Sequence, residues 1–256
     1  MKFDHDIFLR TDYPVATGSN DHISDLDITG ATRDFTDGAP FAQELLGVFP
    51  DKKTLIDLGC ATGEVPLTMR AAGMLAVGLE GSDKPKRAKL GCWSQAPDIV
   101  RTCDIGKPFT IVDLSGAPVT FDFVTSWGVL EHIPEHDFRC CLENILRLMH
   151  KDSIGILNID LGWAEAGVHM LWANHPEGGC HRGQSDHEGC DAPTRYTYLQ
   201  EILPKYFTID DALKQSREWS YCRPTAIELK ALQKAGDHIH AKRSYWWIRK
   251  QQLVQE

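Results

Sequence analysis

A glycine-containing turn between an apolar run and a helix-forming segment constrains the fold of this chain more than any other feature. Residues 54–58 read Thr-Leu-Ile-Asp-Leu, and Gly59 and Gly63 follow before a segment at 64–72 that favours a helix. A chain that turns sharply from a strand into a helix needs glycine for left-handed backbone angles and for close approach of a ligand. The first N–H groups of the helix are then free to bind that ligand. The turn therefore predicts a strand-turn-helix binding site.

Short apolar runs and helix-forming segments alternate along most of the chain. After the turn, four further apolar runs alternate with two helical segments, at 75–79, 84–91, 99–102, 121–126, 136–149 and 154–159. Two β-rich runs follow at 207–209 and 244–248. Such alternation is typical of a mostly parallel sheet with helices on both faces. The sequence therefore predicts an α/β fold with a seven-stranded sheet.

Two segments interrupt this alternation. Residues 1–50 are polar and rich in turns, with one amphipathic helix expected at 41–48, and we predict that they form a cap or lid over the main domain at 51–256. Residues 161–195, after the fifth strand, hold six glycines and no clear period, which is typical of a functional or mobile loop. We expect this insertion to lie on the substrate side of the domain.

Two tryptophans are neighbours in the last expected strand. Trp246 and Trp247 should point to opposite faces of the sheet, because side chains alternate along a strand. One ring then belongs to the core, and we expect the other to be covered by the N-terminal segment or by a second subunit. The sequence gives no oligomeric state.

The charge and the cysteines narrow the classes of function. A net charge of −9 repels phosphate backbones, so we expect no nucleic-acid partner. Eight cysteines are scattered without a disulfide pattern, which indicates a reducing compartment. No apolar stretch is long enough to span a bilayer, and the N-terminus lacks the pattern of a signal peptide. The sequence therefore predicts a cytoplasmic protein.

The residues in the turn distinguish between nucleotide-like ligands. A dinucleotide loop reads G-x-G-x-x-G, whereas Ala61 stands between the two glycines here and Glu64 stands where the last glycine belongs. No Lys-Ser or Lys-Thr pair follows Gly63, which excludes the phosphate-binding loop of nucleotide hydrolases. Glu80 ends the second strand about 20 residues after the turn, where an acid can bind both hydroxyls of a ribose.

With these residues in view, the sequence resembles class I S-adenosylmethionine (SAM)-dependent methyltransferases. Four stretches carry the resemblance in the family's order and spacing: Leu55–Gly63, Gly78–Asp83, Thr102–Ile105 and Phe121–Pro134. The last contains the Leu-Glu-His-Ile-Pro of the small-molecule branch. The resemblance implies a Rossmann-like, doubly wound sheet whose last strand pair is antiparallel, and it implies SAM as the cofactor. The sequence departs from the family at Ala61, where glycine is usual, and in the insertion.

The resemblance also implies which residues bind SAM. The first stretch forms the turn under the cofactor, the second holds the ribose, the third contacts adenine and the fourth lies at the methionine end. The implied cofactor-binding residues are Asp57, Gly59, Cys60, Ala61, Gly63, Glu80, Gly81, Asp104, Ile105, Ser126 and Trp127.

Structural roles remain open for several of these residues. The two glycines form a turn with or without a ligand, and Glu80 can be a solvated acid at a strand end. The alternative for Asp57 is to hold the loop by hydrogen bonds, and for Asp104 it is to cap a turn. For Trp127 the alternative is plain packing.

His132 is the candidate general base. It follows the fourth strand, and an imidazole with a pKa of about 6.5 suits removal of a hydroxyl proton near neutral pH. The alternative is that His132 only orders its loop or closes the cofactor site. No Asn/Asp-Pro-Pro-Tyr or Pro-Cys signature follows the strand, which disfavours amino-group and cytosine methylation. We therefore expect a small-molecule or carbohydrate-like acceptor, methylated on oxygen.

Three other interpretations of the sequence compete with this one. One is a catalytically silent SAM-fold protein that serves as a binding or scaffold subunit. Another is an NAD-dependent oxidoreductase, which the glycine spacing disfavours. The third is a metal site in the insertion, but the spacing of its histidines and cysteines is irregular, so we expect no metal. Those side chains are His169, His175, Cys180, His181, His187 and Cys190.

Overall fold

The computed structural model describes residues 1–16, 38–130, 133, 135–160, 170–171, 179–180, 201–216 and 243–251. Its strands are β1 (Phe8–Thr11), β2 (Thr54–Leu58), β3 (Leu75–Glu80), β4 (Val100–Thr102), β5 (Phe109–Val112), β6 (Phe121–Ser126), β7 (Met149–Asp160), β8 (Met170–Leu171), β9 (Gly179–Cys180), β10 (Phe207–Ile209) and β11 (Arg243–Lys250). Its α-helices are α3 (Gly38–Val48), α4 (Glu64–Ala71), α5 (Lys84–Arg87), α6 (Cys92–Gln95), α7 (Glu135–Leu148) and α10 (Asp211–Gln215).

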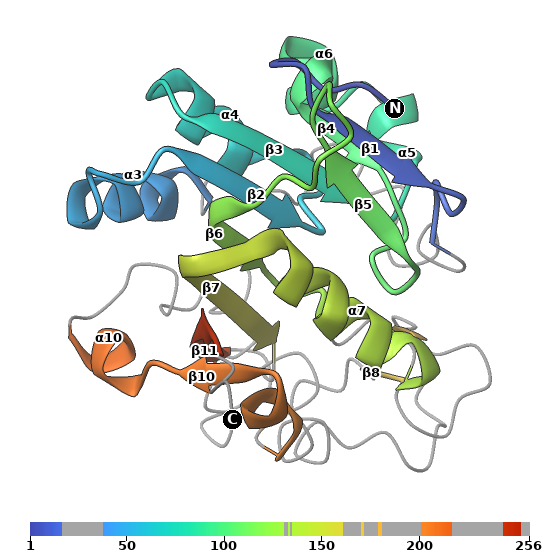
Figure 1. The fold of residues 1–256 in the computed structure, drawn as a ribbon. Helices are drawn as coiled ribbons and strands as arrows, with labels where there is room; N and C mark the ends of the chain where they lie inside the picture. Colours follow the sequence, from blue (N-terminus) through green and yellow to red (C-terminus); the bar gives the residue numbers. More distant parts are fainter. Residues whose placement is uncertain are drawn as a thin grey trace, which may run out of the picture.

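Seven strands form one central sheet in the order β10-β11-β7-β6-β2-β3-β4 (Figure 1). The five strands from β7 to β4 are parallel, β11 is antiparallel to β7, and β10 is antiparallel to β11. This arrangement confirms the predicted fold, including the antiparallel last pair. The chain leaves β2 in one direction to build β3 and β4, and returns to the other side of β2 to build β6 and β7. Ligands of such sheets bind at the carboxyl ends of the strands, where the order reverses.

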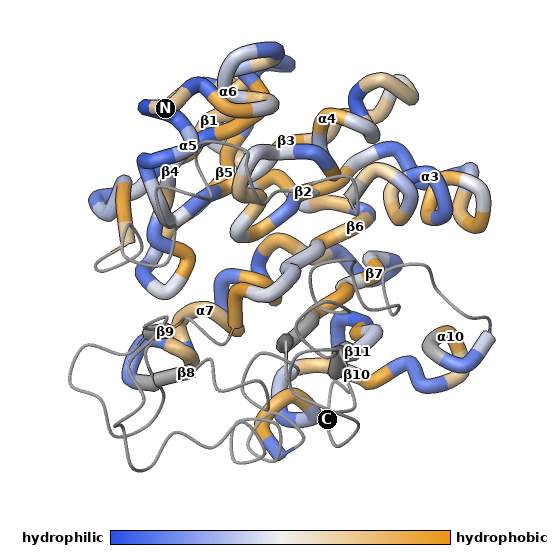
Figure 2. Tube along the Cα trace, turned by 180° about the vertical axis from the view of Figure 1, so that it is seen from behind, coloured by the Kyte–Doolittle hydropathy of each residue, from blue (hydrophilic) through white to orange (hydrophobic). Residues whose placement is uncertain are grey.

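Helices cover both faces of the sheet. On one face α3 and α4 pack against a buried cluster that includes Phe123 and Trp247. On the other face α7 packs against a cluster that includes Val124 and Trp246. The residue colours along α7 alternate between hydrophobic and hydrophilic, as expected for a helix with one face in the core (Figure 2). The two tryptophans therefore lie on opposite faces as predicted, and the N-terminal helix α3 belongs to the cluster around Trp247.

The beginning of the chain contributes to the core in a way that the sequence did not predict. Strands β1 and β5 form a separate antiparallel pair beside the sheet edge (Figure 1). Phe3, Ile7 and Leu9 are buried in the same cluster as α7. The first residues are thus part of the main domain's core, while a lid function for residues 1–50 remains a prediction.

The predicted helix at 84–91 is wrong in its extent. Helix α5 ends at Arg87, and a second short helix, α6, begins at Cys92. Between them Lys89 and Gly91 adopt positive φ angles of 53° and 47°, which interrupt a right-handed helix. Most of the insertion at 161–195 lies outside the described residues, apart from the pair β8–β9.

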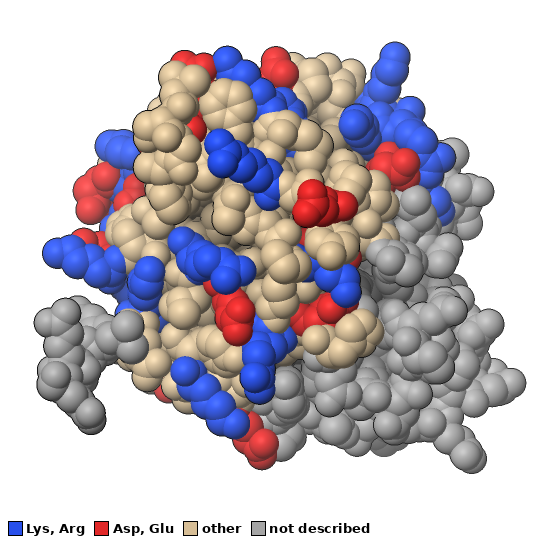
Figure 3. Space-filling model, turned by 45° about the vertical axis from the view of Figure 1, so that its right-hand side comes forward, with Lys and Arg blue, Asp and Glu red and all other residues tan. Residues whose placement is uncertain are grey.

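The described surface carries charges of both signs. Figure 3 shows lysines and arginines interspersed with aspartates and glutamates on one face. Within the described part of the chain, no helix is long and apolar enough to cross a membrane.

Candidate functional site

The carboxyl ends of four neighbouring strands bring the predicted site residues together. Leu58 at the end of β2 is paired with Leu79 of β3 on one side and with Ser126 of β6 on the other. Glu80 of β3 is in turn paired with Thr102 of β4. The residues that follow these strand ends therefore lie side by side, as the parallel sheet requires.

The glycine turn is held against the end of β3. The N–H groups of Gly59 and Cys60 both donate to the carbonyl oxygen of Leu79, at 2.7 and 2.9 Å. Gly59, Ala61 and Gly63 all adopt left-handed backbone angles, with φ of 79°, 48° and 80°. Glycine adopts such angles without steric cost, but alanine does not. Ala61 is therefore a strained position within the turn.

Gly59 also lies directly under the loop that follows β6. A Cβ atom at Gly59 would lie 2.1 Å from Cγ2 of Val129, far closer than two carbon atoms can approach. Any side chain at position 59 would thus displace Val129. This contact ties the first predicted cofactor stretch to the fourth.

Glu80 faces the turn from the end of β3. Its side chain is 8% exposed, and its two carboxylate oxygens accept hydrogen bonds from the N–H groups of Ala61, at 2.7 Å, and Ser82, at 2.8 Å. An acid at the end of the strand after the turn stands where it can bind the ribose of a ligand. The geometry fits a group that offers a pair of hydroxyls, as a ribose does.

Asp104 follows β4 and is buried. Its carboxylate accepts a hydrogen bond of 2.9 Å from the N–H of Gly106, and burial raises the pKa of this carboxyl above its usual value. Ile105 is also buried, and its carbonyl oxygen accepts from the side-chain amide of Asn144 at 2.9 Å. This stretch is therefore fixed against α7.

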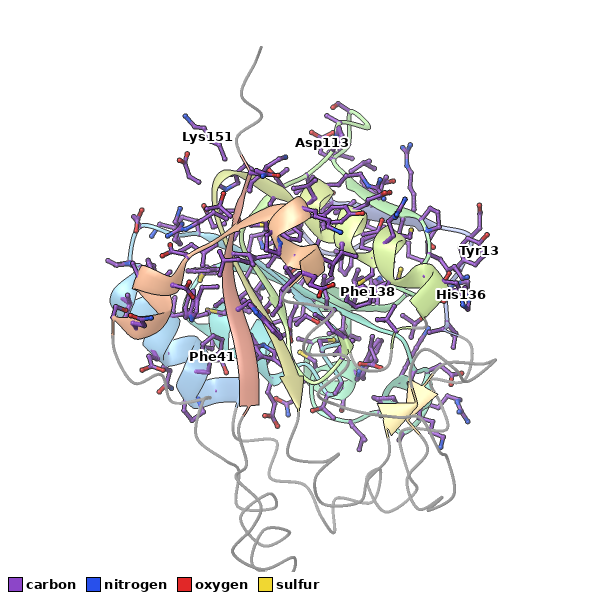
Figure 4. All side chains as sticks on the ribbon, turned by 90° about the horizontal axis from the view of Figure 1, so that it is seen from below. Tyr13, Phe41, Asp113, His136, Phe138 and Lys151 are labelled. Atoms are coloured by element: carbon purple, nitrogen blue, oxygen red, sulfur yellow. The ribbon has the colours of Figure 1, made fainter. Side chains whose placement is uncertain are left out.

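The N-terminal segment runs along the same edge of the sheet. The N–H of Asp104 donates to the carbonyl oxygen of Tyr13, and the N–H of Ala16 donates to that of Gly81, both at 2.9 Å. Tyr13 lies at the same edge of the molecule as His136, near the start of α7 (Figure 4). The predicted cap thus contacts two of the four predicted cofactor stretches through its backbone.

Asp57 is buried beside the turn. Its carboxylate accepts a hydrogen bond of 2.7 Å from the hydroxyl of Thr125. Burial raises the pKa of Asp57 to about 7, with a smaller contribution from the charge of Glu80, while the Thr125 hydrogen bond acts in the opposite direction. The structure thus gives Asp57 a contact between strands, and its role toward a cofactor stays a prediction.

Ser126 is the last residue of β6, at the other side of the turn, and Trp127 follows it. The hydroxyl of Ser126 is fully buried and has no hydrogen-bond partner among the described residues. A buried hydroxyl without a partner is costly unless a ligand or water satisfies it, so this atom fits a ligand-facing position. The Trp127 ring packs edge-to-face on Phe41 of α3, with ring centroids 4.4 Å apart (Figure 4 labels Phe41).

His132 lies outside the described residues, as do Glu131 and Pro134. The residues on either side, Leu130 and Ile133, are buried in the core cluster of α7. The contacts of the imidazole, and its role as a base, therefore stay predictions.

Two residues that support the turn were not identified from the sequence. Cys92 and Trp93 of α6 donate hydrogen bonds to its carbonyl oxygens. No motif distinguishes these residues in the sequence, because the contact depends on how α6 folds back onto the turn. In the described residues there is no group of three or more histidine, cysteine or acidic side chains that could hold a metal ion.

Comparisons with known proteins give a consistent result. The model of a family described as a methyltransferase domain matches residues 33–187, which is more than half of the 256 residues. No curated protein sequence matches the chain.

Solved structures share the fold along nearly the whole chain. The 1,6-didemethyltoxoflavin-N1-methyltransferase of Burkholderia thailandensis is similar with a TM-score of 0.55 and 17% identity, over 98% of this chain and 99% of that one. A TehB-like SAM-dependent methyltransferase from Corynebacterium glutamicum has a TM-score of 0.51 and 15% identity, over 88% and 93% of the two chains. At these identities the likeness establishes the fold alone.

Proposed function

Because this chain belongs to the methyltransferase-domain family of class I SAM-dependent enzymes, we propose that it transfers a methyl group from SAM to an oxygen of a small-molecule or carbohydrate-like acceptor. The observation that carries the proposal is the contact between the turn and the acid of the next strand. Glu80 accepts from the N–H of Ala61 at 2.7 Å, so that a carboxylate for a ribose and a turn for close ligand approach form one unit.

The cofactor is SAM, which supplies an activated methyl group when it is bound. We assign the ribose hydroxyls to Glu80 and the adenine to Asp104 and Ile105. The unpartnered hydroxyl of Ser126 faces the methionine end in this assignment. The role of these residues is to hold two reactants in line, and such orientation can supply roughly 7–11 kcal/mol of a barrier.

The acceptor is proposed from charge and from the loop after β6. A net charge of −9 disfavours polyanionic acceptors such as nucleic acids. His132 would take the hydroxyl proton of the acceptor, and the buried neighbours Leu130 and Ile133 anchor the loop on either side of it. The Burkholderia enzyme named above acts on a small molecule, which agrees with a small acceptor here, although its name specifies methylation at N1.

A transfer assay tests the acceptor. The protein is incubated with SAM labelled in the methyl group and with separate panels of sugars, small alcohols, small amines and nucleic acids. We expect label in a hydroxyl compound, with the new methyl on oxygen by NMR. Label on nitrogen, or on nucleic acid, would contradict the acceptor but not the cofactor. Binding of SAM without methyl transfer to any compound in the panels would instead favour a catalytically silent binding protein.

A further inference from the structure

Three consecutive carbonyl oxygens of the glycine turn accept hydrogen bonds from one short segment. The Nε1–H of Trp93 donates to Ala61 at 2.8 Å, the backbone N–H of Cys92 donates to Thr62 at 2.7 Å, and the thiol of Cys92 donates to Gly63 at 3.2 Å. We call residues 91–93 the brace. It lies outside every stretch that resembles the family.

The brace approaches the turn as closely as backbones allow. A Cβ atom on Gly91 would lie 2.5 Å from the carbonyl oxygen of Thr62, and one on Gly63 would lie 2.6 Å from Cβ of Cys92. Both glycines adopt positive φ angles, of 47° and 80°. Neither site has room for a side chain, so the contact depends on glycine from both partners.

Burial keeps the donors of the brace in place. Cys92 and Trp93 belong to a small buried cluster with Cys60, Ile99 and Val100, at the side of the sheet next to β4. Burial raises the pKa of the Cys92 thiol to about 12, so the sulfur keeps its proton at neutral pH and remains a donor. Trp93 is 7% exposed, and the only polar atom of its side chain is the one that donates to Ala61.

Ala61 is the residue that links the brace to Glu80. It adopts a φ of 48° although it carries a side chain, a conformation that L-residues other than glycine seldom adopt. Its N–H donates to Glu80 and its carbonyl oxygen accepts from Trp93. Both backbone polar groups of the strained residue are therefore bonded: its N–H to Glu80 and its carbonyl oxygen to Trp93 of the brace.

We propose that Trp93 is a positioning residue for SAM: its indole N–H holds Ala61, and with it Glu80, in the arrangement that binds the cofactor. The inference rests on the proposed function, because it takes the turn and Glu80 to be the cofactor site. Without the indole N–H the strained turn relaxes in part of the molecules. The apparent affinity then falls in proportion to the fraction that remains competent to bind.

Trp93→Phe removes the indole N–H and keeps an aromatic ring in the cluster. We expect the Kd for S-adenosylhomocysteine, measured by calorimetry, to rise about 3- to 10-fold, the usual effect of one lost hydrogen bond. The turnover at saturating SAM should stay near that of the parent protein, because the acceptor side is untouched. The matched control is Trp246→Phe, since Trp246 is equally buried at 6% exposure but lies in β11, away from the turn.

A second variant separates positioning from packing. Ala61→Gly relieves the strain of the left-handed angle, so that the turn no longer depends on the brace. Combined with Trp93→Phe, it should recover most of the lost affinity for S-adenosylhomocysteine. Ala61→Gly alone is the reference for the Kd and for the melting temperature, because relief of the strain also stabilises the fold.

Five outcomes distinguish the possibilities. A higher Kd in Trp93→Phe, which returns towards the parent value when Ala61→Gly is added, supports the positioning role. Equal Kd values in Trp93→Phe and the parent protein overturn it, as does an equal loss in Trp246→Phe. No recovery by Ala61→Gly also overturns it, because Trp93 would then act through packing. Failure of the parent protein to bind either SAM or S-adenosylhomocysteine would overturn the proposed function and the positioning role together.

Discussion

The carboxylate of Asp57, at the end of β2, accepts a hydrogen bond of 2.7 Å from the hydroxyl of Thr125 on the neighbouring strand β6. Both residues are buried, and burial raises the pKa of Asp57 to about 7. The folded protein therefore holds a proton on this group over a pH range in which the unfolded chain releases it. This relationship gives the stability of the fold a definite dependence on pH.

Asp57→Asn should remove that dependence. In the parent protein this group's contribution to the free energy of unfolding is fully present below about pH 4, falls as the pH rises towards about 7, and is constant above that. The interval from 3.8 to about 7 corresponds to a loss of order 4 kcal/mol. Asparagine accepts the same bond from Thr125 without titrating, so Asp57→Asn should gain stability relative to the parent across this range.

Urea unfolding of both proteins at several pH values between about 4.5 and 8 measures the effect. Other titrating groups are common to the two proteins and cancel in the difference between their unfolding free energies. A difference that stays constant over this range would show that Asp57 titrates near its usual pKa.

Glu80→Ala should weaken the binding of the cofactor and also lower the stability of the fold. Losing one charge-assisted bond to a ribose hydroxyl should raise the Kd for S-adenosylhomocysteine at least about tenfold. The N–H groups of Ala61 and Ser82 lose their acceptor as well, at a cost of about 1–3 kcal/mol each if they stay buried. Calorimetry and urea unfolding measure the two effects separately.

Glu80→Gln keeps one acceptor oxygen and should fall between the parent protein and Glu80→Ala in stability. The control is Glu143→Gln, which changes a half-exposed acid of α7 and should alter neither property. An unchanged Kd in Glu80→Ala would place the ribose elsewhere.

The succession of strands and helices along the chain, and the segments that bear the site, could be predicted because the evidence for them is local. Each short apolar run is a strand buried on both faces, and Gly59 and Gly63 mark a backbone conformation that few other residues adopt. Glu80 could be placed because the ends of adjacent parallel strands must meet. These features follow from neighbouring residues and from sheet geometry alone.

The features that the sequence did not predict depend on contacts between distant residues. Strand β1 pairs with β5 about a hundred positions later, and nothing in either strand identifies its partner. The helix expected at 84–91 ends at Arg87, and Gly91 approaches Thr62 instead, a contact that exists only after folding. Trp93 was missed for the same reason, since its partner is a carbonyl oxygen in the turn.

His132→Ala tests the chemical step. If His132 takes the acceptor proton, its removal should lower turnover about 10²-fold or more while the Kd for SAM stays nearly the same. Asparagine or glutamine at this position should not restore the rate, because an amide accepts no proton at neutral pH. Steady-state kinetics with the acceptor found in the transfer assay, together with calorimetry of SAM, give both quantities. Loss of SAM binding in His132→Ala would make the residue part of the cofactor site, and the base would then be sought in the insertion.

The most direct test of the account is a thermal-shift titration of the parent protein with SAM, S-adenosylhomocysteine and NAD. We propose that the turn, Glu80 and Asp104 bind a single nucleoside, and the glycine spacing does not suit a pyrophosphate. We predict that SAM and S-adenosylhomocysteine each stabilise the fold, by about 2.7 kcal/mol at a hundredfold excess over the Kd, and that NAD does not. Stabilisation by NAD alone, with no response to either SAM or S-adenosylhomocysteine, would contradict the account.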